Sequence, residues 1–388
     1  MSPQPLYDLS PVFHVMIMGL LLALGPLAWV WVRNQRASTI QRLHALTLLT
    51  LFLTFDLVMF GAFTRLTDSG LGCPDWPGCY GSASPVGATA HISAAQSAMP
   101  TGPVTHGKAW VEMIHRYLAT SVGVLILVLT AASWALRRRR QQIDRASVWL
   151  ASLALLWVCL QGAFGALTVT MKLFPAIVTL HLLGGVVLLA MLCSLAIRYQ
   201  RGLESPPLVA VSSGTRGALW VASALLWIQI ALGGWVSTNY AVLACTEFPM
   251  CQASWWPAMN FAQGFEIWRE LGFTRAGEHI AFEALTAIHV THRFFAVLVL
   301  AALVLLAWRL RSVPPLRRQT RLLTGLAALQ LMTGLSNVVM DWPLLAAVLH
   351  TGGAGALVVV LTWTTCVTTG ARSQGVHALT TTKTGSPA

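Results

Sequence analysis

Four histidines stand at matching positions in two stretches of the chain and offer the clearest chemistry in the sequence. His115 and His292 are each followed by an arginine, and His181 and His350 each lie three residues before a glycine. A neutral imidazole nitrogen is a good ligand for metal ions, heme iron included. A single histidine in an apolar segment is more often a hydrogen-bonded packing residue. Four at equivalent positions instead favour two pairs of metal ligands.

Heme and zinc are the two occupants that such histidine pairs suggest. Zinc normally needs three or four ligands in a compact set, whereas two facing histidines can ligate the iron of a flat macrocycle. Small residues let a helix backbone approach such a ring closely. Glycines of this kind follow the second histidine of each pair, at Gly184, Gly185, Gly352 and Gly353. The sequence therefore favours two heme sites.

The two pairs differ in the residue one helical turn before the first histidine. Glu112 precedes His115 on the same helix face, whereas His289 takes the matching place before His292. A carboxyl group there can take or give protons during oxidation of a bound substrate, and a salt bridge to Arg116 is the alternative. His289 is either a supporting group or the ligand in place of His292. This asymmetry suggests a reactive site in the first half and a supporting, electron-relaying site in the second.

Long apolar helices must position these residues. Of 388 residues, 56% are hydrophobic and 10% charged, whereas a soluble domain usually carries about 25% charged residues. A helix needs roughly 20 apolar residues to cross a bilayer. Apolar runs of this kind predict nine spans, at residues 12–32, 43–64, 110–135, 147–170, 174–197, 218–237, 287–308, 322–340 and 344–367.

Most of the 25 lysines and arginines lie in alternate connections between these runs. Cytoplasmic loops carry such an excess of positive charge, so the net charge of +12 indicates membrane topology and not nucleic-acid binding. We expect a multi-pass protein of the bacterial inner membrane with a cytoplasmic C-terminus. Its N-terminus and residues 65–109 and 238–286 then lie outside, and the four histidines form one layer near the outer face.

Three arginines lie at the outer ends of predicted spans. Arg116 and Arg293 directly follow their histidines, and Arg65 ends the second span. Guanidinium groups at this depth can bind the propionates of a heme. The alternative, of equal weight, is that they are ordinary anchors at the membrane interface.

The chain contains an internal repeat. Residues 61–79 align with residues 233–251, each with two cysteines six residues apart, and His181 aligns with His350. Each repeat has an even number of spans, so both share one orientation. We predict an all-α polytopic membrane protein of two parallel four-helix-bundle repeats plus one extra N-terminal transmembrane helix. The predicted boundaries are 1–42 for the extra helix and its connection, 43–201 for the first repeat with the substrate-heme site, 202–217 for a linker, 218–370 for the second repeat, and 371–388 for a cytoplasmic tail.

The cysteines divide between spans and outer segments. Those within spans are expected to be packing residues, at Cys159, Cys193 and Cys366. The others lie outside, where an oxidising compartment makes two disulfides plausible, at Cys73, Cys79, Cys245 and Cys251. Of the outer segments, residues 82–107 are expected to be flexible and residues 260–286 to contain a short surface helix.

The longest motif resembles the heme A synthase family. It runs Gly61-Ala-Phe-Thr-Arg-Leu-Thr-Asp-Ser-Gly-Leu-Gly-Cys-Pro-Asp-Trp-Pro-Gly-Cys79 and is followed by Glu112-Met-Ile-His-Arg116. The likeness continues through Gln161-Gly, Thr179-Leu-His181 and the second-half histidines, and covers about residues 43–367. The extra first span departs from the eight-helix pattern of that family.

This resemblance implies oxidation of the C8 methyl of heme O to the formyl group of heme A by successive hydroxylations, for cytochrome oxidase biogenesis. It implies a heme b as cofactor, and heme O, membrane lipid, a ferredoxin-like electron donor and heme O synthase as partners. The site residues that it implies are His115 and His181 for the substrate heme, His292 and His350 for heme b, Glu112 for the reaction, and a bond between Cys73 and Cys79.

Three other functions compete. A diheme electron-transfer protein needs the same histidines but has no evident need for Glu112. A thiol oxidoreductase acting through the outer cysteine pairs lacks the Cys-X-X-Cys spacing that tunes thiol acidity. A transporter with parallel repeats would be expected to have an interrupted helix with an ion site, and the sequence shows none.

Overall fold

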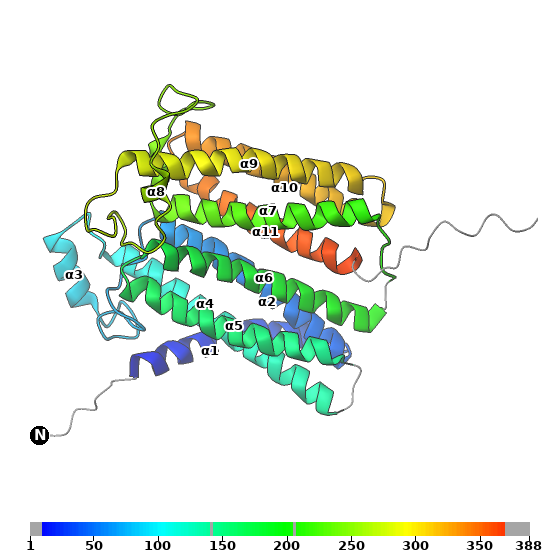
Figure 1. Cartoon of the computed structure of the whole chain (residues 1–388). Helices are drawn as coiled ribbons and strands as arrows, with labels where there is room; N and C mark the ends of the chain where they lie inside the picture. Colours follow the sequence, from blue (N-terminus) through cyan, green and yellow to red (C-terminus); the bar gives the residue numbers. More distant parts are fainter. Residues whose placement is uncertain (1–9, 140–142, 205–206, 369–388) are drawn as a thin grey trace, which may run out of the picture.

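The computed structural model of the chain describes residues 10–139, 143–204 and 207–368. Within this part, nine helices are long and apolar enough to cross a membrane, and each coincides with a predicted span (Figure 1). The prediction of a multi-pass, nearly all-helical protein is therefore confirmed. The nine helices are α1 (Ser10–Arg33), α2 (Thr39–Leu66), α4 (His106–Arg138), α5 (Arg145–Thr170), α6 (Pro175–Glu204), α7 (Ser213–Thr238), α9 (Phe282–Leu310), α10 (Arg317–Val339) and α11 (Leu344–Thr368).

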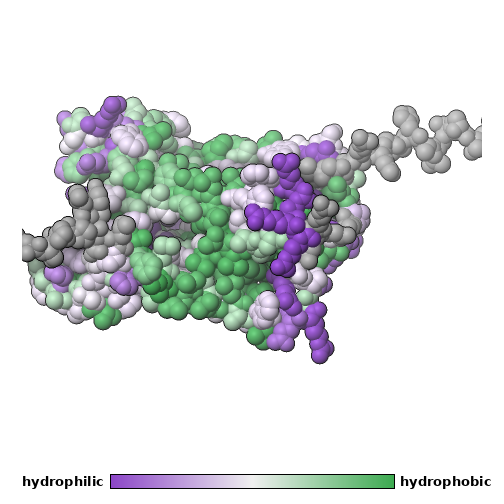
Figure 2. Space-filling model, turned by 90° about the horizontal axis from the view of Figure 1, so that it is seen from below, coloured by the Kyte–Doolittle hydropathy of each residue, from purple (hydrophilic) through white to green (hydrophobic). Residues whose placement is uncertain are grey.

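The helices run side by side, and their connections gather at two ends (Figure 1). The C-terminal ends of α1, α4, α6 and α9, each of which carries an arginine in its last turn, lie at one end, which we call the arginine end. The opposite end, which we call the loop end, carries two long connections. Apolar side chains cover the middle of the face seen in Figure 2, with hydrophilic ones toward the ends. This distribution fits a bilayer around the middle of the helices.

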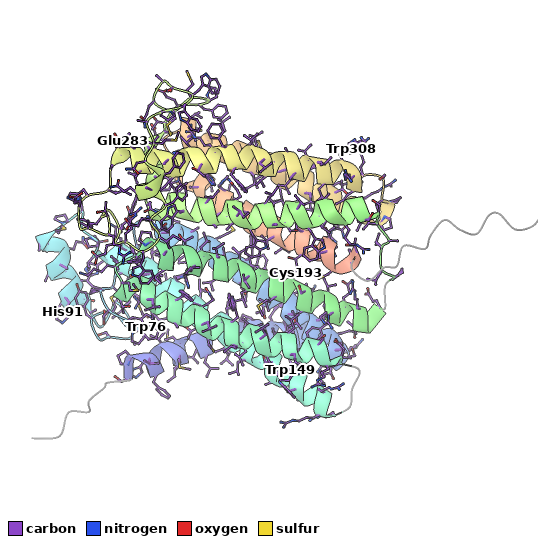
Figure 3. The ribbon with its side chains drawn as sticks, viewed as in Figure 1. Trp76, His91, Trp149, Cys193, Glu283 and Trp308 are labelled. Carbon is purple, nitrogen blue, oxygen red and sulfur yellow. A yellow bond between two sulfur atoms is a disulfide. The ribbon has the colours of Figure 1, made fainter. Side chains whose placement is uncertain are left out.

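Tryptophans mark the arginine end. Trp149 and Trp308 are more than half exposed there, far from Trp76, His91 and Glu283 at the loop end (Figure 3). Tryptophan is enriched where a membrane meets water, because its ring is both apolar and polar. The two side chains fit an interfacial belt.

Each half of the chain is a ring of four helices. In the first half α2 contacts α4, α4 contacts α5, α5 contacts α6, and α6 contacts α2. In the second half α7, α9, α10 and α11 follow one another in the same way. Opposite corners are therefore α4 and α6 in one ring, and α9 and α11 in the other.

The two rings meet through α2 and α6 on one side and α7 and α11 on the other. Small residues allow these helices to approach closely. A Cβ atom at Gly352 of α11 would lie 3.1 Å from Met59 Sδ of α2, and one at Gly234 of α7 would lie 3.1 Å from Thr179 of α6. The rings thus share a packed interface and not a cleft.

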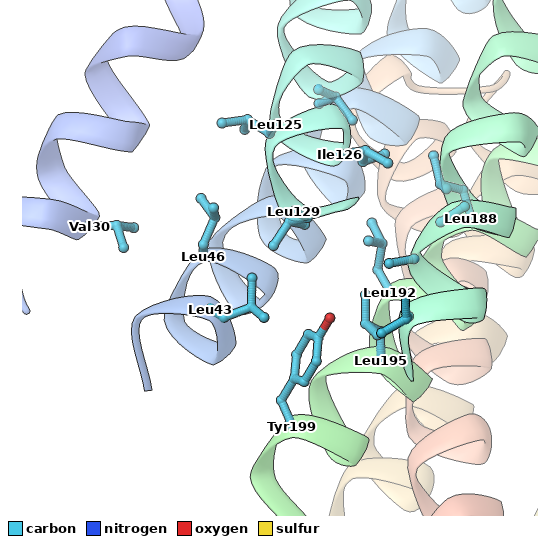
Figure 4. Packing of buried hydrophobic residues seen from close by; sticks show 14 of the residues in the cluster. Val30, Leu43, Leu46, Leu125, Ile126, Leu129, Leu188, Leu192, Leu195 and Tyr199 are labelled. Carbon is cyan, nitrogen blue, oxygen red and sulfur yellow. The ribbon is translucent and has the colours of Figure 1, made fainter. Parts of the chain in front are cut away.

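The core of the first ring lies toward the arginine end. Leucines and other apolar side chains of α2, α4 and α6 interlock there, among them Leu43, Leu129 and Leu192 (Figure 4). Two polar links cross this layer, one from Ser133 Oγ to the Tyr199 hydroxyl at 2.7 Å and one from Thr130 Oγ1 to the Ala151 carbonyl at 2.9 Å. Because apolar packing fills this half of the ring, polar chemistry is confined to the loop end.

The extra helix α1 lies outside both rings and contacts α4 and α2. A Cβ atom at Gly19 would overlap with Thr120 of α4, so the helices touch where the side chain is absent. The opposite face of α1 exposes large apolar side chains such as Phe13 and Trp29. Such a face suits lipid.

The outer segments differ from expectation. Residues 82–107, predicted to be flexible, contain the helix α3 (Thr89–Ala98), whose Ile92 is fully buried. Alanine is the strongest helix former, and this alanine-rich stretch also has an apolar anchor. In residues 260–286 the predicted surface helix is only the single turn α8 (Phe261–Gly264). Gly272 and Gly277, with φ of +81° and +85°, belong to turns.

Of the three cysteines within spans, only Cys193 is buried, whereas Cys366 is half-buried and Cys159 is exposed. The expectation of packing residues is therefore right for Cys193 and wrong for Cys159. Helical periodicity places Cys159 on the outer face of α5.

Candidate functional site

All four histidines lie in one layer near the loop end, within about three turns of the start of their helices. His115 of α4 and His181 of α6 occupy opposite corners of the first ring, and their imidazoles are close enough to interact electrostatically. His292 of α9 and His350 of α11 have the same relation in the second ring. Side chains on facing helices build the cofactor sites of helix bundles. The structure thus brings together both predicted pairs.

A glycine of the neighbouring helix lies against each histidine ring. A Cβ atom at Gly61 would be 3.1 Å from His115 Cε1, and one at Gly233 would be 3.1 Å from His292 Cε1. Gly165 and Gly334 stand in the same way beside His181 and His350, at 3.6 and 3.2 Å. Because glycine has no side chain, each imidazole fits into a narrow space against the neighbouring helix, which we call its glycine slot. The motifs contained these glycines, and their repetition at matching positions was the signal for this role.

The glycines singled out from the sequence face other side chains. A Cβ atom at Gly184 would overlap with the amide of Gln161, and one at Gly353 with the amide of Gln330. Gly185 and Gly352 face α2. The interpretation of these four glycines as room for a macrocycle is therefore wrong. The sequence placed them near the histidines but could not show which side of the helix faces the ring interior.

The imidazole side chains of all four histidines are half-buried within the bundle. In the first ring the Nδ1 atoms of His115 and His181 are buried without a hydrogen-bond partner among the described residues. In the second ring Thr333 Oγ1 lies 2.9 Å from His350 Nδ1, and Gln229 Nε2 lies 3.1 Å from His292 Nδ1. Sequence reasoning missed Thr333 and Gln229.

Glu112 is 4% exposed and has two partners on its carboxylate. Oε1 forms an ion pair with Arg116, so the predicted alternative of a salt bridge is present. Oε2 accepts a hydrogen bond from the backbone N–H of Cys73 at 2.8 Å. Both partners stabilise the ionised carboxylate. Glu112 therefore joins α4 to the cysteine loop one turn from His115.

The cysteine pairs are bonded as predicted. Disulfides join Cys73 to Cys79 and Cys245 to Cys251, with Cα–Cα distances of 4.9 Å in both. Each loop then turns back at its second cysteine, through a bridge to Ser82 in one loop and Ser254 in the other. The two loops thus have the same shape over the two rings.

Arginines clamp these loops to the helices. Arg116 Nη1 donates to the carbonyl oxygens of Asp75 and Pro77 at 3.0 and 3.1 Å, and also to Gly78. Arg293 donates to three loop carbonyls, those of Cys245 at 2.7 Å, Glu247 at 2.9 Å and Met250 at 3.2 Å. Neither arginine is a simple interfacial anchor. Their binding of heme propionates stays a prediction.

Arg65 joins the two halves at the loop end. Its Nη2 donates to Ser237 O at 2.7 Å, its Nη1 pairs with Asp68 at 3.3 Å, and its guanidinium lies over the Tyr240 ring. Burial and the neighbouring Asp68 raise the pKa of the Tyr240 phenol, which donates to Asp68 Oδ1 at 2.5 Å. Arg65 thus has a structural role between the loops.

His289, the counterpart of Glu112, is 3% exposed and does not take the place of His292. Its Nε2 accepts a hydrogen bond from Arg293 Nε at 3.2 Å, so this nitrogen is already bound to a side chain of its own helix. His292 instead faces His350 and has its glycine slot at Gly233. The geometry favours His292 as the ligand and His289 as a support for the arginine clamp.

Heme fits these residues. Two imidazoles stand at opposite corners of each ring of helices, each beside a glycine of the neighbouring helix. Such a pair can ligate one iron from both sides. Zinc would need a third ligand, and within the described ranges no three His, Cys, Asp or Glu side chains form a metal-binding group.

Comparison with known proteins shows the family of the chain. Residues 44–362 match the COX15-CtaA family, described as cytochrome oxidase assembly protein; α1 lies outside the match. A heme A synthase of Shewanella oneidensis is 39% identical over 81% of this chain and 92% of its own length. Heme A synthases of Halalkalibacterium halodurans (27% identity, 79% of this chain and 89% of the relative) and Erythrobacter litoralis (28%, 80% and 92%) are also similar. From the family match and the relative in Shewanella, the chain belongs to the COX15-CtaA family of cytochrome oxidase assembly proteins.

Proposed function

We propose that this protein is a heme A synthase, which oxidises the C8 methyl of heme O to the formyl group of heme A by successive hydroxylations. The observation that carries the proposal is the facing pair of His115 and His181 with Glu112 one turn away, in a chain of this family. A diheme electron-transfer protein would use the same histidines, but the buried Glu112 would then have no chemical task.

In the first ring, His115 and His181 hold the substrate through its iron. Their helices fix the two imidazoles at one depth, and Gly61 and Gly165 keep each ring in its slot. Positioning of this kind places the reacting methyl group at a constant distance from the residues around the site. The apolar farnesyl group of heme O suits entry from the lipid between helices.

Glu112 handles protons beside the first site. Arg116 and the Cys73 N–H hold its carboxylate in one orientation, and a held carboxylate can accept a proton as the methyl group is oxidised. The contact with the outer loop also offers the proton a route away from the bundle. His289 takes the equivalent place in the second ring, which fits a site without chemistry on a substrate.

In the second ring, His292 and His350 are proposed to hold a heme b. That group supplies one-electron redox chemistry near the first site. The packed contacts of α6 with α7 and α11 fix the two rings relative to each other, so the distance between the sites is constant.

The protein is proposed to lie in the bacterial inner membrane with the loop end outside and the C-terminus in the cytoplasm. The disulfides favour this orientation because the outer side is oxidising, and the arginine end fits the cytoplasmic side. A ferredoxin-like electron donor and heme O synthase are the proposed partners.

The direct test is the heme content of the protein. We expect protein purified from cells that make heme O to contain heme B together with heme O, a hydroxylated heme O or heme A, as measured by pyridine hemochrome spectra and chromatography of extracted heme. Heme B alone would favour electron transfer, and protein without heme would contradict both functions.

A further inference from the structure

The two rings of helices differ in what surrounds the Nδ1 atoms of their histidines. In the second ring both Nδ1 atoms have polar side-chain neighbours, Thr333 for His350 and Gln229 for His292. In the first ring both Nδ1 atoms are buried, and among the residues that the structure describes they have no hydrogen-bond partner. The difference affects every histidine of the site.

Thr333 is 5% exposed and its hydroxyl proton is already in use. Oγ1 donates to the Leu329 carbonyl, one turn earlier in α10, at 2.7 Å. At 2.9 Å from His350 Nδ1, the same oxygen can therefore only accept, and Nδ1 must carry the proton. A neutral imidazole with its proton on Nδ1 has its free electron pair on Nε2. Thr333 thus selects the tautomer of His350 that is ready to bind iron.

The first ring has no equivalent of this contact. In the aligned motifs, Gln161-Gly-Ala-Phe-Gly165 and Gln330-Leu-Met-Thr-Gly334, the residue that matches Thr333 is Phe164. A phenyl ring cannot accept a hydrogen bond from His181 Nδ1 in the way that an oxygen does. Among the described residues, no hydrogen bond to Nδ1 selects a tautomer of His181.

The other histidine of each ring shows the same contrast. Gln229 Nε2 of α7 lies 3.1 Å from His292 Nδ1 and 3.4 Å from His292 Nε2, and donates to the His292 backbone carbonyl at 3.2 Å. The aligned residue of α2 is Leu57, which has no polar side-chain atom. Two polar side chains of the second ring thus replace two apolar ones of the first.

We propose that Thr333, with Gln229, is a positioning residue that makes the second ring a permanent heme site, while Phe164 and Leu57 leave the first ring able to exchange its heme. This inference rests on the proposed function, in which heme b stays and heme O must enter and heme A must leave. A hydrogen bond to the outer nitrogen of a metal-binding histidine fixes the ring and strengthens it as a ligand, and its loss typically costs about 10- to 100-fold in affinity.

The test is the release of heme B from the intact protein. Wild type and the variants Thr333→Val, Thr333→Ala and Thr333→Ser are purified with bound heme B and mixed with excess apomyoglobin, and heme transfer is followed by absorbance. We expect Thr333→Val and Thr333→Ala to release heme B about tenfold faster or more, or to lose it during purification. Their heme B midpoint potential should rise, because a weaker histidine ligand stabilises ferric iron less.

Two variants separate positioning from general damage. Thr333→Ser keeps the oxygen and should restore slow release. Thr324→Val removes a threonine of the same helix whose hydroxyl bonds only to the Thr320 carbonyl one turn earlier, at 3.0 Å, and should release heme B as wild type does. If Thr333→Val and Thr333→Ala both released heme B at the wild-type rate and kept the wild-type midpoint potential, the inference would be overturned. The proposed function would be unaffected by that result. Wild type without heme B would contradict the proposed function itself.

Discussion

Glu112 shows how a single residue combines chemistry and structure at this site. Its carboxylate is buried and bound to both Arg116 and the Cys73 N–H. The proton role and the salt bridge, which the sequence presented as alternatives, are therefore compatible. A residue held by two donors is well suited to transfer protons at a constant position.

Replacement of Glu112 separates these roles. Glu112→Gln keeps an oxygen for the Cys73 N–H but cannot take a proton, so heme binding should persist while formyl production falls by about 100-fold or more. Heme extraction after expression with a heme O source measures both. Glu278→Gln, an exposed change in the outer segment, is the control and should behave as wild type. Heme A made at the normal rate by Glu112→Gln would show that the carboxylate has no proton role.

The glycine slots give a second prediction at the residue scale. A Cβ atom at Gly61 or Gly233 lies only 3.1 Å from its histidine ring, so valine there should displace the imidazole. We expect Gly61→Val to lose heme O and heme A, and Gly233→Val to lose heme B, with the other site loaded. Gly162→Val is the matched control, because nothing lies within 4 Å of its Cβ position. If Gly61→Val and Gly233→Val had normal heme content, these glycines would not be needed to make room for the imidazoles.

At the scale of elements, the disulfide loops are held by the helices beneath them. Arg293 donates three hydrogen bonds to the second loop, and bonds from a charged donor contribute roughly 1.5–3 kcal/mol each. Arg293→Gln should therefore loosen the loop without unfolding the bundle. Hydrogen bonds to the helices beneath therefore hold the disulfide loops in place.

Amide hydrogen exchange measures how firmly Arg293 holds the second disulfide loop. In Arg293→Gln, amide exchange in residues 245–256 should speed up by about tenfold or more, since roughly 1.4 kcal/mol corresponds to a factor of ten in an opening equilibrium. Exchange in α9 and α10 should stay unchanged. Arg275→Gln, in the same outer segment, serves as the control. An unaltered loop in Arg293→Gln would mean that the disulfide alone holds it.

The elements also show what the sequence could and could not predict. Apolar length was enough to locate nine helices, the repeat was enough to pair His115 with His181, and the family resemblance indicated the bond between Cys73 and Cys79. Contacts between distant segments, such as Cys73 with Glu112, depend on how the loop folds back, and no local pattern encodes them. The asymmetry of Thr333 and Phe164 was visible in the aligned motifs. Its consequence for the histidines became clear only from the contact between Thr333 and His350 Nδ1.

At the scale of the whole molecule, orientation in the membrane decides which side the heme sites face. The arginine end should stay in the cytoplasm because positive loops are not readily translocated. Alkaline phosphatase, which is active only outside the cytoplasm, should therefore be active when fused after Gly277 and inactive when fused after Ser312. The reverse pattern would place the histidine layer near the inner face and contradict the proposed topology.

One chain is proposed to carry two unequal heme sites, one for substrate and one for a permanent cofactor. The most direct measurement is the heme composition of four single variants, His115→Ala, His181→Ala, His292→Ala and His350→Ala, purified from cells that make heme O. We predict that the first two retain heme B and lack heme O and heme A, whereas the last two lose heme B. If all four lost the same heme in the same proportion, the two rings would not be separate sites, and the account would be wrong.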